Sequence, residues 1–243
     1  MRVPRLYTQQ TLDVGSMVSM DKDAARYLSS VLRMTSGQML NLFNGEGGEY
    51  VAEVVSLSKN QVTVSIKGSL PNDRESLLKI HLVIGISRGE RMDWVIQKAT
   101  ELGVHTITPI FTERTEVKLA GSRLEKRLVH WQQVSISACE QCLRNVVPTI
   151  NSAVSLQQCL GTHDGGLKIV LHHRTERPLT ELQNTNNHVT ILVGPEGGLS
   201  DDEITLAESN GYNAVKLGPR VLRTETAPLA EISILQSLWG DMG

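Results

Sequence analysis

The chain has 243 residues, of which 40% are hydrophobic and 21% charged, and these values exclude a disordered or fibrous protein. Its formal net charge of −2 excludes a whole-molecule attraction to nucleic acid, so any RNA binding must be local. The sequence has no apolar run near the ~18 residues that span a bilayer and no signal-peptide segment, so we expect a cytoplasmic protein.

Residues 1–72 have the pattern of a small β-rich domain. The segment "DKDAARYLSSVLRM" places Ala24, Leu28 and Leu32 at helical spacing behind acidic residues, which predicts one helix over 21–34. Runs of alternating apolar residues follow, separated by the turn signals "NGEGG" and "SKN". These runs are 38–43, 49–57 and 61–68. The pattern predicts a β meander or a small barrel that ends at a polar linker.

Basic residues gather in two groups along this otherwise balanced sequence. The first group consists of Arg2, Arg5, Arg26 and Arg33. The second group consists of Arg114, Lys118, Arg123, Lys126 and Arg127. Such groups are more often solvated faces than phosphate sites. Because the first group falls on the small β-rich domain, we hypothesise that it contacts RNA phosphates.

Residues 73–243 are predicted to form an α/β domain. A buried strand (78–87), an amphipathic helix (90–103) and a second strand (105–111) occur in that order, which indicates a βαβ unit with a parallel sheet. The apolar face of this helix consists of Met92, Val95, Ile96, Ala99 and Leu102. Gly103 is expected to end the helix.

A long helix is expected next, beginning at an S-x-x-E capping box formed by Ser122 and Glu125 and ending near Leu143. It contains a C-x-x-C pair, Cys139 and Cys142. The chain has only three cysteines and no second pair, so we predict neither a disulfide framework nor a metal site. The two thiols are interpreted as neighbours on one helix face.

Near the C-terminus, three further strands are predicted, each followed by a loop of unusual composition. They fall within 167–174, 189–198 and 214–227. In an open parallel sheet, ligands bind beyond the carboxyl ends of the strands, so these loops could converge on one pocket. Adjacent strand residues point to opposite faces, so His172 and His173 are interpreted as structural rather than as metal ligands.

The loop after the second of these strands reads "GPEGG", and "LSDDEI" then begins a helix with Ser200 as N-cap and Glu203 as capping-box partner. Glu196 in this turn, with acidic residues following, opposes a polyphosphate. Neither a P-loop nor a G-x-G-x-x-G motif occurs. The turn favours a neutral or cationic ligand such as S-adenosylmethionine, and the alternative is a tight turn without any ligand.

A second strand, Gly-Pro turn and helix follow in "KLGPRVLRTETA", residues 216–227. This loop concentrates hydrogen-bond donors and acceptors within a few positions. They are Arg220, Arg223, Thr224, Glu225 and Thr226. A purely structural connection rarely needs such a density of charged and hydroxyl groups. Pro228 is tolerated because it lies in the first turn of the next helix.

These two loops, together with "SRGERMDWVIQKATELGV", "ACEQCLRN" and "RVPRLY", resemble the SPOUT-class family of 16S ribosomal RNA methyltransferases that modify N3 of a uridine. The resemblance runs nearly end to end. Leu143 departs from the family's glycine, which puts the local turn and the role of Arg144 in doubt.

The resemblance implies an N-terminal PUA-like RNA-binding β-barrel over 1–72 and a SPOUT domain over 73–243, with a trefoil knot that forms the S-adenosylmethionine pocket. It also implies a homodimer whose active sites use both subunits, no metal, and no membrane. The implied substrate is uridine 1498 of 16S rRNA in the assembled small ribosomal subunit.

The implied site has two kinds of residue. The cofactor-binding candidates, acting through their backbones, are Leu171, Val193, Gly194, Pro195, Glu196, Gly197, Gly198, Leu217, Gly218, Val221, Leu222, Arg223, Thr224 and Thr226. N3 of uridine carries a proton, so methyl transfer needs a group that accepts this proton and a donor for the charge that develops on the base. Arg223 and Arg144 are the candidate donors to the uracil oxygens, and Glu225 or Glu196 the candidate proton acceptor.

Two other functions remain open at this point. One is a non-catalytic RNA-binding factor for ribosome assembly that has kept the pocket. The other is a different α/β nucleotide enzyme, which the missing phosphate-binding motifs disfavour.

Overall fold

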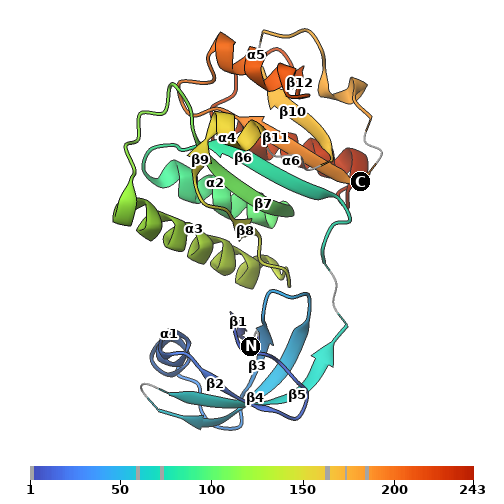
Figure 1. The fold of residues 1–243 in the computed structure, drawn as a ribbon. Coiled ribbons are helices and arrows are strands. Elements are labelled where there is room, and N and C mark those ends of the chain that lie inside the picture. The colour runs from blue at the N-terminus through green and yellow to red at the C-terminus, as the bar shows by residue number, and fades with distance from the viewer. Residues whose placement is uncertain (1–2, 59–60, 72–73, 162–164, 173, 184–185) are drawn as a thin grey trace. The chain divides into compact units, whose positions relative to one another are not determined.

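The computed structural model describes residues 3–58, 61–71, 74–161, 165–172, 174–183 and 186–243 (Figure 1). The chain forms two compact units. The first contains the residues up to Glu75 together with Cys139–Val147, and the second contains Ser76–Ala138 and Pro148–Gly243. The predicted boundary at 72/73 falls on residues outside the described ones and stays a prediction. The membership of 139–147 in the first unit was not predicted.

The first unit is built on a five-stranded sheet in the order β1-β3-β4-β5-β2. Its strands are β1 (Arg5–Tyr7), β2 (Met17–Met20), β3 (Met39–Phe43), β4 (Glu49–Leu57) and β5 (Val62–Leu70). Neighbouring strands are antiparallel except β1 and β3, which are parallel. The predicted meander is therefore confirmed as β3-β4-β5. Leu40, Val54 and Val64 lie in its fully buried core.

The predicted helix at 21–34 forms as two shorter pieces. α1 (Lys22–Arg26) begins at Asp21, whose carboxylate accepts a hydrogen bond from Ala24 N at 2.8 Å. A π-helical turn, η1 (Tyr27–Val31), continues it. The chain then leaves the helix, because Arg33 has a left-handed φ of 52°.

The Arg5 side chain holds the 139–147 segment within the first unit. Its Nη1 donates to Cys139 O at 2.7 Å, and its Nη2 donates to Arg144 O at 2.7 Å and Asn145 Oδ1 at 2.6 Å. Its Nε donates to the Glu49 carboxylate at 3.2 Å. Desolvation lowers the pKa of Arg5, although the Glu49 carboxylate opposes that shift.

A buried ion pair secures the same segment from its other side. The Arg144 guanidinium donates to the Glu75 carboxylate through Nη2 at 2.6 Å and Nε at 3.1 Å. Glu75 Oε1 also accepts from the backbone N–H groups of Asn145 and Val146 at 3.2 Å. One carboxylate thus fixes both a side chain and the local backbone.

The second unit contains a parallel sheet in the order β12-β10-β11-β6-β7-β8, with β9 also paired to β7 (Figure 1). The strands are β6 (Lys79–Gly85), β7 (Val104–Phe111), β8 (Thr149–Ile150), β9 (Val154–Ser155), β10 (Leu167–Leu171), β11 (His188–Val193) and β12 (Asn213–Val215). Every strand pairing in this sheet is parallel. The predicted α/β class, with a small β domain and a parallel-sheet domain, is confirmed.

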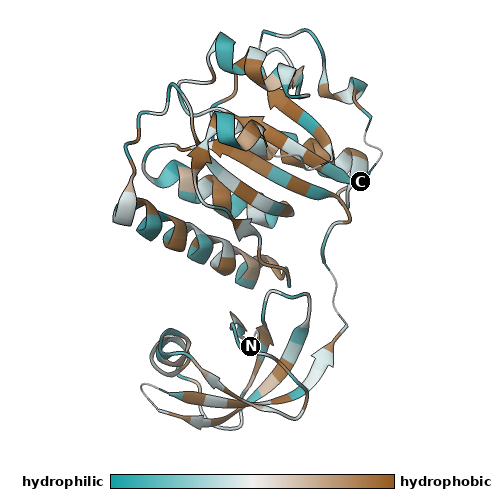
Figure 2. Ribbon diagram, viewed as in Figure 1, coloured by the Kyte–Doolittle hydropathy of each residue, from teal (hydrophilic) through white to brown (hydrophobic). Residues whose placement is uncertain are grey.

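Helices cover both faces of this sheet. They are α2 (Glu90–Glu101), α3 (Gly121–Cys142), α4 (Leu156–Leu160), α5 (Asp201–Ser209) and α6 (Ala227–Trp239), with a short 3-10 helix η2 (Leu179–Glu181). α2, α3 and α6 pack on the face that includes Leu82, and α4 and α5 pack on the face that includes Val83. The strands are apolar on both faces for this reason, as their brown colour in Figure 2 shows.

Two of the helix predictions are confirmed, and one helix start is wrong. Met92, Val95, Ile96 and Ala99 are fully buried or nearly so on α2, as predicted. The capping box of Ser200 and Glu203 is present at the start of α5. α3, however, begins at Gly121, so Ser122 lies inside its first turn and the predicted capping box does not mark the start.

The segment after β12 lies against the connection between β10 and β11. Lys216 N donates to Arg177 O at 3.0 Å, and Lys216 also forms an isolated parallel bridge with Pro178. The trefoil knot itself stays a prediction from the resemblance. Among the described helices, none is both long and apolar enough to cross a bilayer.

Two polar side chains on α6 are completely buried. Gln236 accepts a hydrogen bond from Ser76 Oγ at 2.8 Å and donates to Leu102 O at 3.0 Å. Glu231 differs, because neither of its carboxyl oxygens has a hydrogen-bond partner among the described residues.

The buried pair in the first unit leads to a stability prediction. Glu75→Ala should lower the free energy of unfolding by about 3 kcal/mol, because it leaves a buried guanidinium without its carboxylate. Glu53→Ala is the matched control, since Glu53 pairs with Lys67 at an exposed position, and its loss should stay below about 1 kcal/mol. Urea unfolding followed by circular dichroism measures both, and equal losses would contradict the role given to Glu75.

Candidate ligand-binding site

A cavity of about 520 Å³ lies beyond the carboxyl ends of β10, β11 and β12. Its size is within the range of pockets that bind small molecules. The predicted residues that line it are Leu171, Val193, Gly194, Pro195, Glu196, Gly197, Gly198, Leu217, Gly218, Val221, Leu222, Arg223, Thr224 and Glu225. Thr226 does not line the cavity. The structure thus brings nearly all of the predicted cofactor residues around one space, and their role in binding stays a prediction.

The first wall of the cavity is the turn at residues 194–198. Gly198 N donates to Pro195 O at 2.8 Å, and Gly198 has a φ of 70°, which L-amino acids rarely adopt. A Cβ on Gly194 would lie only 2.8 Å from Gly198 C and Leu199 N. The turn therefore closes tightly enough that Gly194 cannot carry a side chain.

The end of β6 packs directly against this turn. A Cβ on Gly85 would lie 2.4 Å from Pro195 N, which is closer than any real contact of that kind. Gly85 is thus required for the turn to rest against the sheet. Sequence reasoning missed this residue, because Gly85 occurs inside an ordinary apolar run and only the tertiary contact gives it a role.

A side-chain hydrogen bond joins the two loops of the cavity. Thr224 Oγ1 donates to Gly194 O at 2.7 Å. The second loop is itself folded into a turn, in which Thr226 N and Ala227 N both donate to Arg223 O at 2.9 Å. The two Gly-Pro loops that the sequence singled out are therefore held in one arrangement.

The β7–α3 connection braces the glycine turn from outside. Arg114 Nη1 donates to Gly197 O at 3.1 Å and to Leu199 O at 3.2 Å. Next to it, Glu113 N donates to the Glu203 carboxylate at 2.8 Å. The sequence indicated Arg114 only as part of a basic group, and no local pattern could have shown that it binds carbonyls about eighty residues away.

Glu196, in the middle of the turn, is bound by α2 and the residues before it. Its Oε1 accepts from Arg88 N and from Arg91 Nη1, each at 2.9 Å. Burial raises the pKa of Glu196, but the hydrogen bonds from backbone N–H groups and from Arg91 outweigh it, so that the pKa is lowered overall. Glu196 is consequently an anion whose charge is compensated locally.

The cavity as a whole has more cationic than acidic residues in its lining, although the turn at residues 194–198 contains an acid. The cationic residues that line it are Arg91, Arg114, Arg174, Lys216, Arg220 and Arg223. The acidic ones are Glu196, Asp201 and Glu225. Arg174 pairs with Asp201 at 3.1 Å and Lys216 pairs with Glu176. Among the described residues, Arg220, Arg223 and Glu225 have no side-chain partner and are free to bind a ligand.

A second, shallower hollow adjoins this cavity. It is lined by Glu90, Arg91, Trp94 and Glu225, so it shares Arg91 and Glu225 with the first. The Trp94 side chain is 44% exposed there.

Several predicted site residues lie elsewhere. Arg144 does not line the cavity but belongs to the first unit, where it is 5% exposed and bound to Glu75. The proposal that Arg5 contacts RNA is corrected, because its side chain is 5% exposed and engaged by protein acceptors. Arg26 and Arg33 are exposed and remain candidates. Arg2 lies outside the described residues.

The residues interpreted as structural lie in different parts of the chain, and that interpretation stays a prediction. Cys139 is buried, with its Sγ 3.7 Å from Val146 O, and Cys142 is free of disulfides. His172 lines the cavity, whereas His173 lies outside the described residues. No group of three metal-ligating side chains occurs within the described part of the chain.

Known proteins resemble this chain over nearly its whole length. Residues 74–236 match the family described as RNA methyltransferase domain, and residues 21–67 match the RNA methyltransferase PUA domain. The ribosomal RNA small subunit methyltransferase E of Buchnera aphidicola is 37% identical over 99% of this chain and 98% of its own. That of Bacillus subtilis is 31% identical over 94% and 93%.

A solved structure is similar to this chain in both fold and sequence. The ribosomal RNA small subunit methyltransferase E from Neisseria gonorrhoeae bound to S-adenosyl methionine has a TM-score of 0.94 and 37% identity, with 100% of each chain covered.

The contacts of Glu196 lead to a prediction about its ionisation. Arg91→Gln should raise the pKa of Glu196 toward its ordinary value, because a cation and a charge-assisted hydrogen bond are lost. A carbon-13 NMR titration of the glutamate carboxyls measures this shift. Arg174→Gln is the control, since Arg174 lines the same cavity but pairs with Asp201. An unchanged Glu196 pKa in Arg91→Gln would contradict the assignment.

Proposed function

Because this chain belongs to the ribosomal RNA small subunit methyltransferase E family, we propose that it methylates N3 of uridine 1498 in 16S rRNA, with S-adenosylmethionine as methyl donor. The chain is an rRNA methyltransferase of α/β fold with a PUA domain. The observation that best supports the proposal is the cavity that two tied Gly-Pro loops form at the carboxyl ends of parallel strands.

The cavity suits the proposed donor in its shape and its backbone. Glycine at 194, 197, 198 and 218 leaves main-chain groups accessible, and such groups can bind the hydroxyls and base of an adenosine. Leu171, Val193 and Leu217 supply apolar surface beside them. The bound cofactor would supply a methyl group on a sulfonium, which becomes a thioether when the methyl leaves.

The roles on the substrate side follow from which charged groups are free. Arg223 has no side-chain partner among the described residues, so it can donate to a uracil oxygen as negative charge develops there. Glu225 is likewise unpaired and can accept the N3 proton. Glu196 is a weaker candidate, because its lowered pKa and its bonds to Arg88 and Arg91 leave it a structural role.

Arg144 is not retained as a donor to uracil. Its guanidinium is bound to Glu75 within the first unit, and using it would require breaking a buried ion pair. Its contribution is to fix the 139–147 segment. In the exposed part of the same unit, Arg26 and Arg33 are the N-terminal residues that we propose contact RNA of the assembled small subunit.

A reconstituted reaction tests the proposed function. Purified protein, labelled S-adenosylmethionine and small ribosomal subunits from cells that lack this protein should give a methyl group on N3 of uridine 1498, located by nuclease digestion and mass spectrometry. Arg223→Ala should lower kcat about 100-fold, the typical cost of losing one donor to developing charge. Arg177→Ala, an exposed arginine outside the cavity, is the control.

Two outcomes would contradict these proposals in different ways. Transfer to another nucleotide or atom would refute the substrate assignment. Normal kcat in Arg223→Ala would leave the substrate assignment intact and remove the catalytic role of that side chain.

We also propose a homodimer, supported by the exposed surface of α6. Leu229 and Ile234 on this helix are half-buried against the core, and Leu238 near its end is 44% exposed. Exposed apolar surface of this kind marks protein–protein interfaces when it is contiguous. Trp94 lies beside the residue Glu225 that precedes α6, so the same face adjoins the catalytic candidates.

A single charge on α6 tests the dimer. Leu238→Lys should shift the protein from dimer to monomer, because it places a charge in an apolar interface. Light scattering coupled to size exclusion measures the mass. Leu206→Lys on α5, where the leucine is 38% exposed, is the matched control. A dimer that persists in Leu238→Lys would mean that α6 does not form the interface.

A further inference from the structure

The cationic side chains of the second unit separate into a paired and an unpaired group. Most are engaged: Arg88 with Glu116, Arg91 with Glu196, Lys98 with Glu101, Arg127 with Asp93, Arg174 with Asp201, Arg177 with Asn213, Lys216 with Glu176, Lys168 over Tyr212, and Arg114 with two carbonyls. Among the described residues, those without any such partner are Lys79, Lys118, Arg123, Lys126, Arg220 and Arg223.

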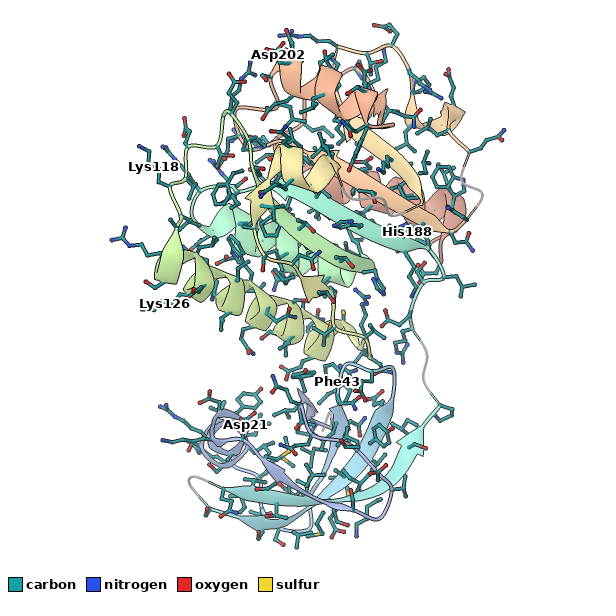
Figure 3. The ribbon with its side chains drawn as sticks, viewed as in Figure 1. Asp21, Phe43, Lys118, Lys126, His188 and Asp202 are labelled. Atoms are coloured by element: carbon teal, nitrogen blue, oxygen red, sulfur yellow. The ribbon has the colours of Figure 1, made fainter. Side chains whose placement is uncertain are left out.

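All but one of the unpaired cations belong to two segments at the same edge of the sheet. Lys118 lies on the β7–α3 connection, and Arg123 and Lys126 lie in the first turns of α3; Lys118 and Lys126 are labelled in Figure 3. Arg220 lies on the loop after β12. Both segments follow the carboxyl ends of parallel strands. Lys79 is the exception, because it is the first residue of β6 and lies at the opposite edge.

The β7–α3 connection is tied directly to the cavity. Arg114, four residues before Lys118, lines the cavity and binds two carbonyls of the glycine turn. Within α3, Arg123 and Lys126 are three residues apart and therefore lie on one side of the helix, whereas Glu125 falls about 160° around the helix from Arg123. Lys118, Arg123 and Lys126 thus follow the tied residue Arg114 along the chain, and Glu116, the acid between Arg114 and Lys118, is paired with Arg88 at 2.9 Å.

We propose that Lys118, Arg123 and Lys126, together with Arg220, form a surface that binds phosphates of the RNA strand containing the target uridine. This inference rests on the proposed function, since it places an RNA strand at the cavity. All four side chains are exposed and therefore accessible to a macromolecule, and Arg220 lines the cavity as well. Because the net charge is −2, attraction to RNA must come from local basic surfaces such as this one.

This surface adds to the few RNA-binding candidates of the first unit. Among the N-terminal arginines, Arg5 is engaged in internal hydrogen bonds, so fewer cations are available for RNA there than the sequence indicated. Phosphate contacts fix the position of a nucleic acid without reading its bases. Cations close to the cavity would therefore hold the strand in register while Arg223 and Glu225 act on the base.

Charge-neutralising variants test this surface through the salt dependence of binding. The first variant combines Lys118→Gln, Arg123→Gln and Lys126→Gln. For its binding to small ribosomal subunits, the slope of log Kd against log salt concentration should be lower than that of wild type by about 2 to 3, because each phosphate contact contributes roughly 0.7–0.9 to the slope. Arg220→Gln should lower it by about 1. Lys79→Gln, an unpaired and exposed cation at the other edge, should leave it unchanged.

The kinetics separate a positioning role from a general defect. In the triple variant, KM for small subunits should rise while kcat at saturating subunits and the calorimetric Kd for S-adenosylmethionine stay at wild-type values. A wild-type salt slope in the triple variant would overturn the proposal. Weakened S-adenosylmethionine binding in Arg220→Gln would overturn its assignment to RNA, because Arg220 would then serve the cofactor.

The binding measurement is independent of the reaction. If wild-type protein fails to methylate small subunits, the proposed function fails. The salt slopes of wild type and triple variant still decide whether this surface binds RNA phosphates.

Discussion

The contact between the end of β6 and the turn at residues 194–198 is the constraint on which the cavity depends. Gly85 and Gly194 both lie where a single methyl group would collide with main-chain atoms. Because that backbone is packed so closely, the carbonyl of Gly194 is in place to accept the hydroxyl of Thr224, which in turn positions the second loop. The shape of the site therefore comes from main-chain packing, and its side chains are left free for chemistry.

This arrangement divides the charged residues by task. Arg91 and Arg114 are used to hold the turn, the first through Glu196 and the second through carbonyl groups. The charges of Arg91 and Arg114 are therefore already paired with protein groups. Arg223 and Glu225 occupy a loop that is held by backbone hydrogen bonds, so their side chains are not needed for folding. An acid in a glycine turn is accordingly compatible with an otherwise basic cavity.

Local sequence patterns were sufficient for several of the longer elements but not for the shortest strands or for tertiary roles. The alternation of β3-β4-β5, the apolar face of α2 and the capping box of α5 are determined by neighbours in the chain, and these predictions were confirmed. β8 and β9 have two residues each, too few for any pattern. Arg5 looked like a surface arginine, since nothing near it in sequence reveals its acceptors at 139–145.

The buried Glu231 makes the stability of the folded protein depend on pH. Its complete burial, without a hydrogen-bond partner among the described residues, raises the pKa of this carboxyl well above its ordinary value. The native chain therefore retains a proton that the unfolded chain releases once the pH exceeds about 4.3. Between that pH and the raised native pKa, each increase in pH favours unfolding. Through this one acid, proton release opposes the packing of α6, so the contribution of Glu231 to stability is fully present below about pH 4.3 and declines as the pH rises toward its raised native pKa.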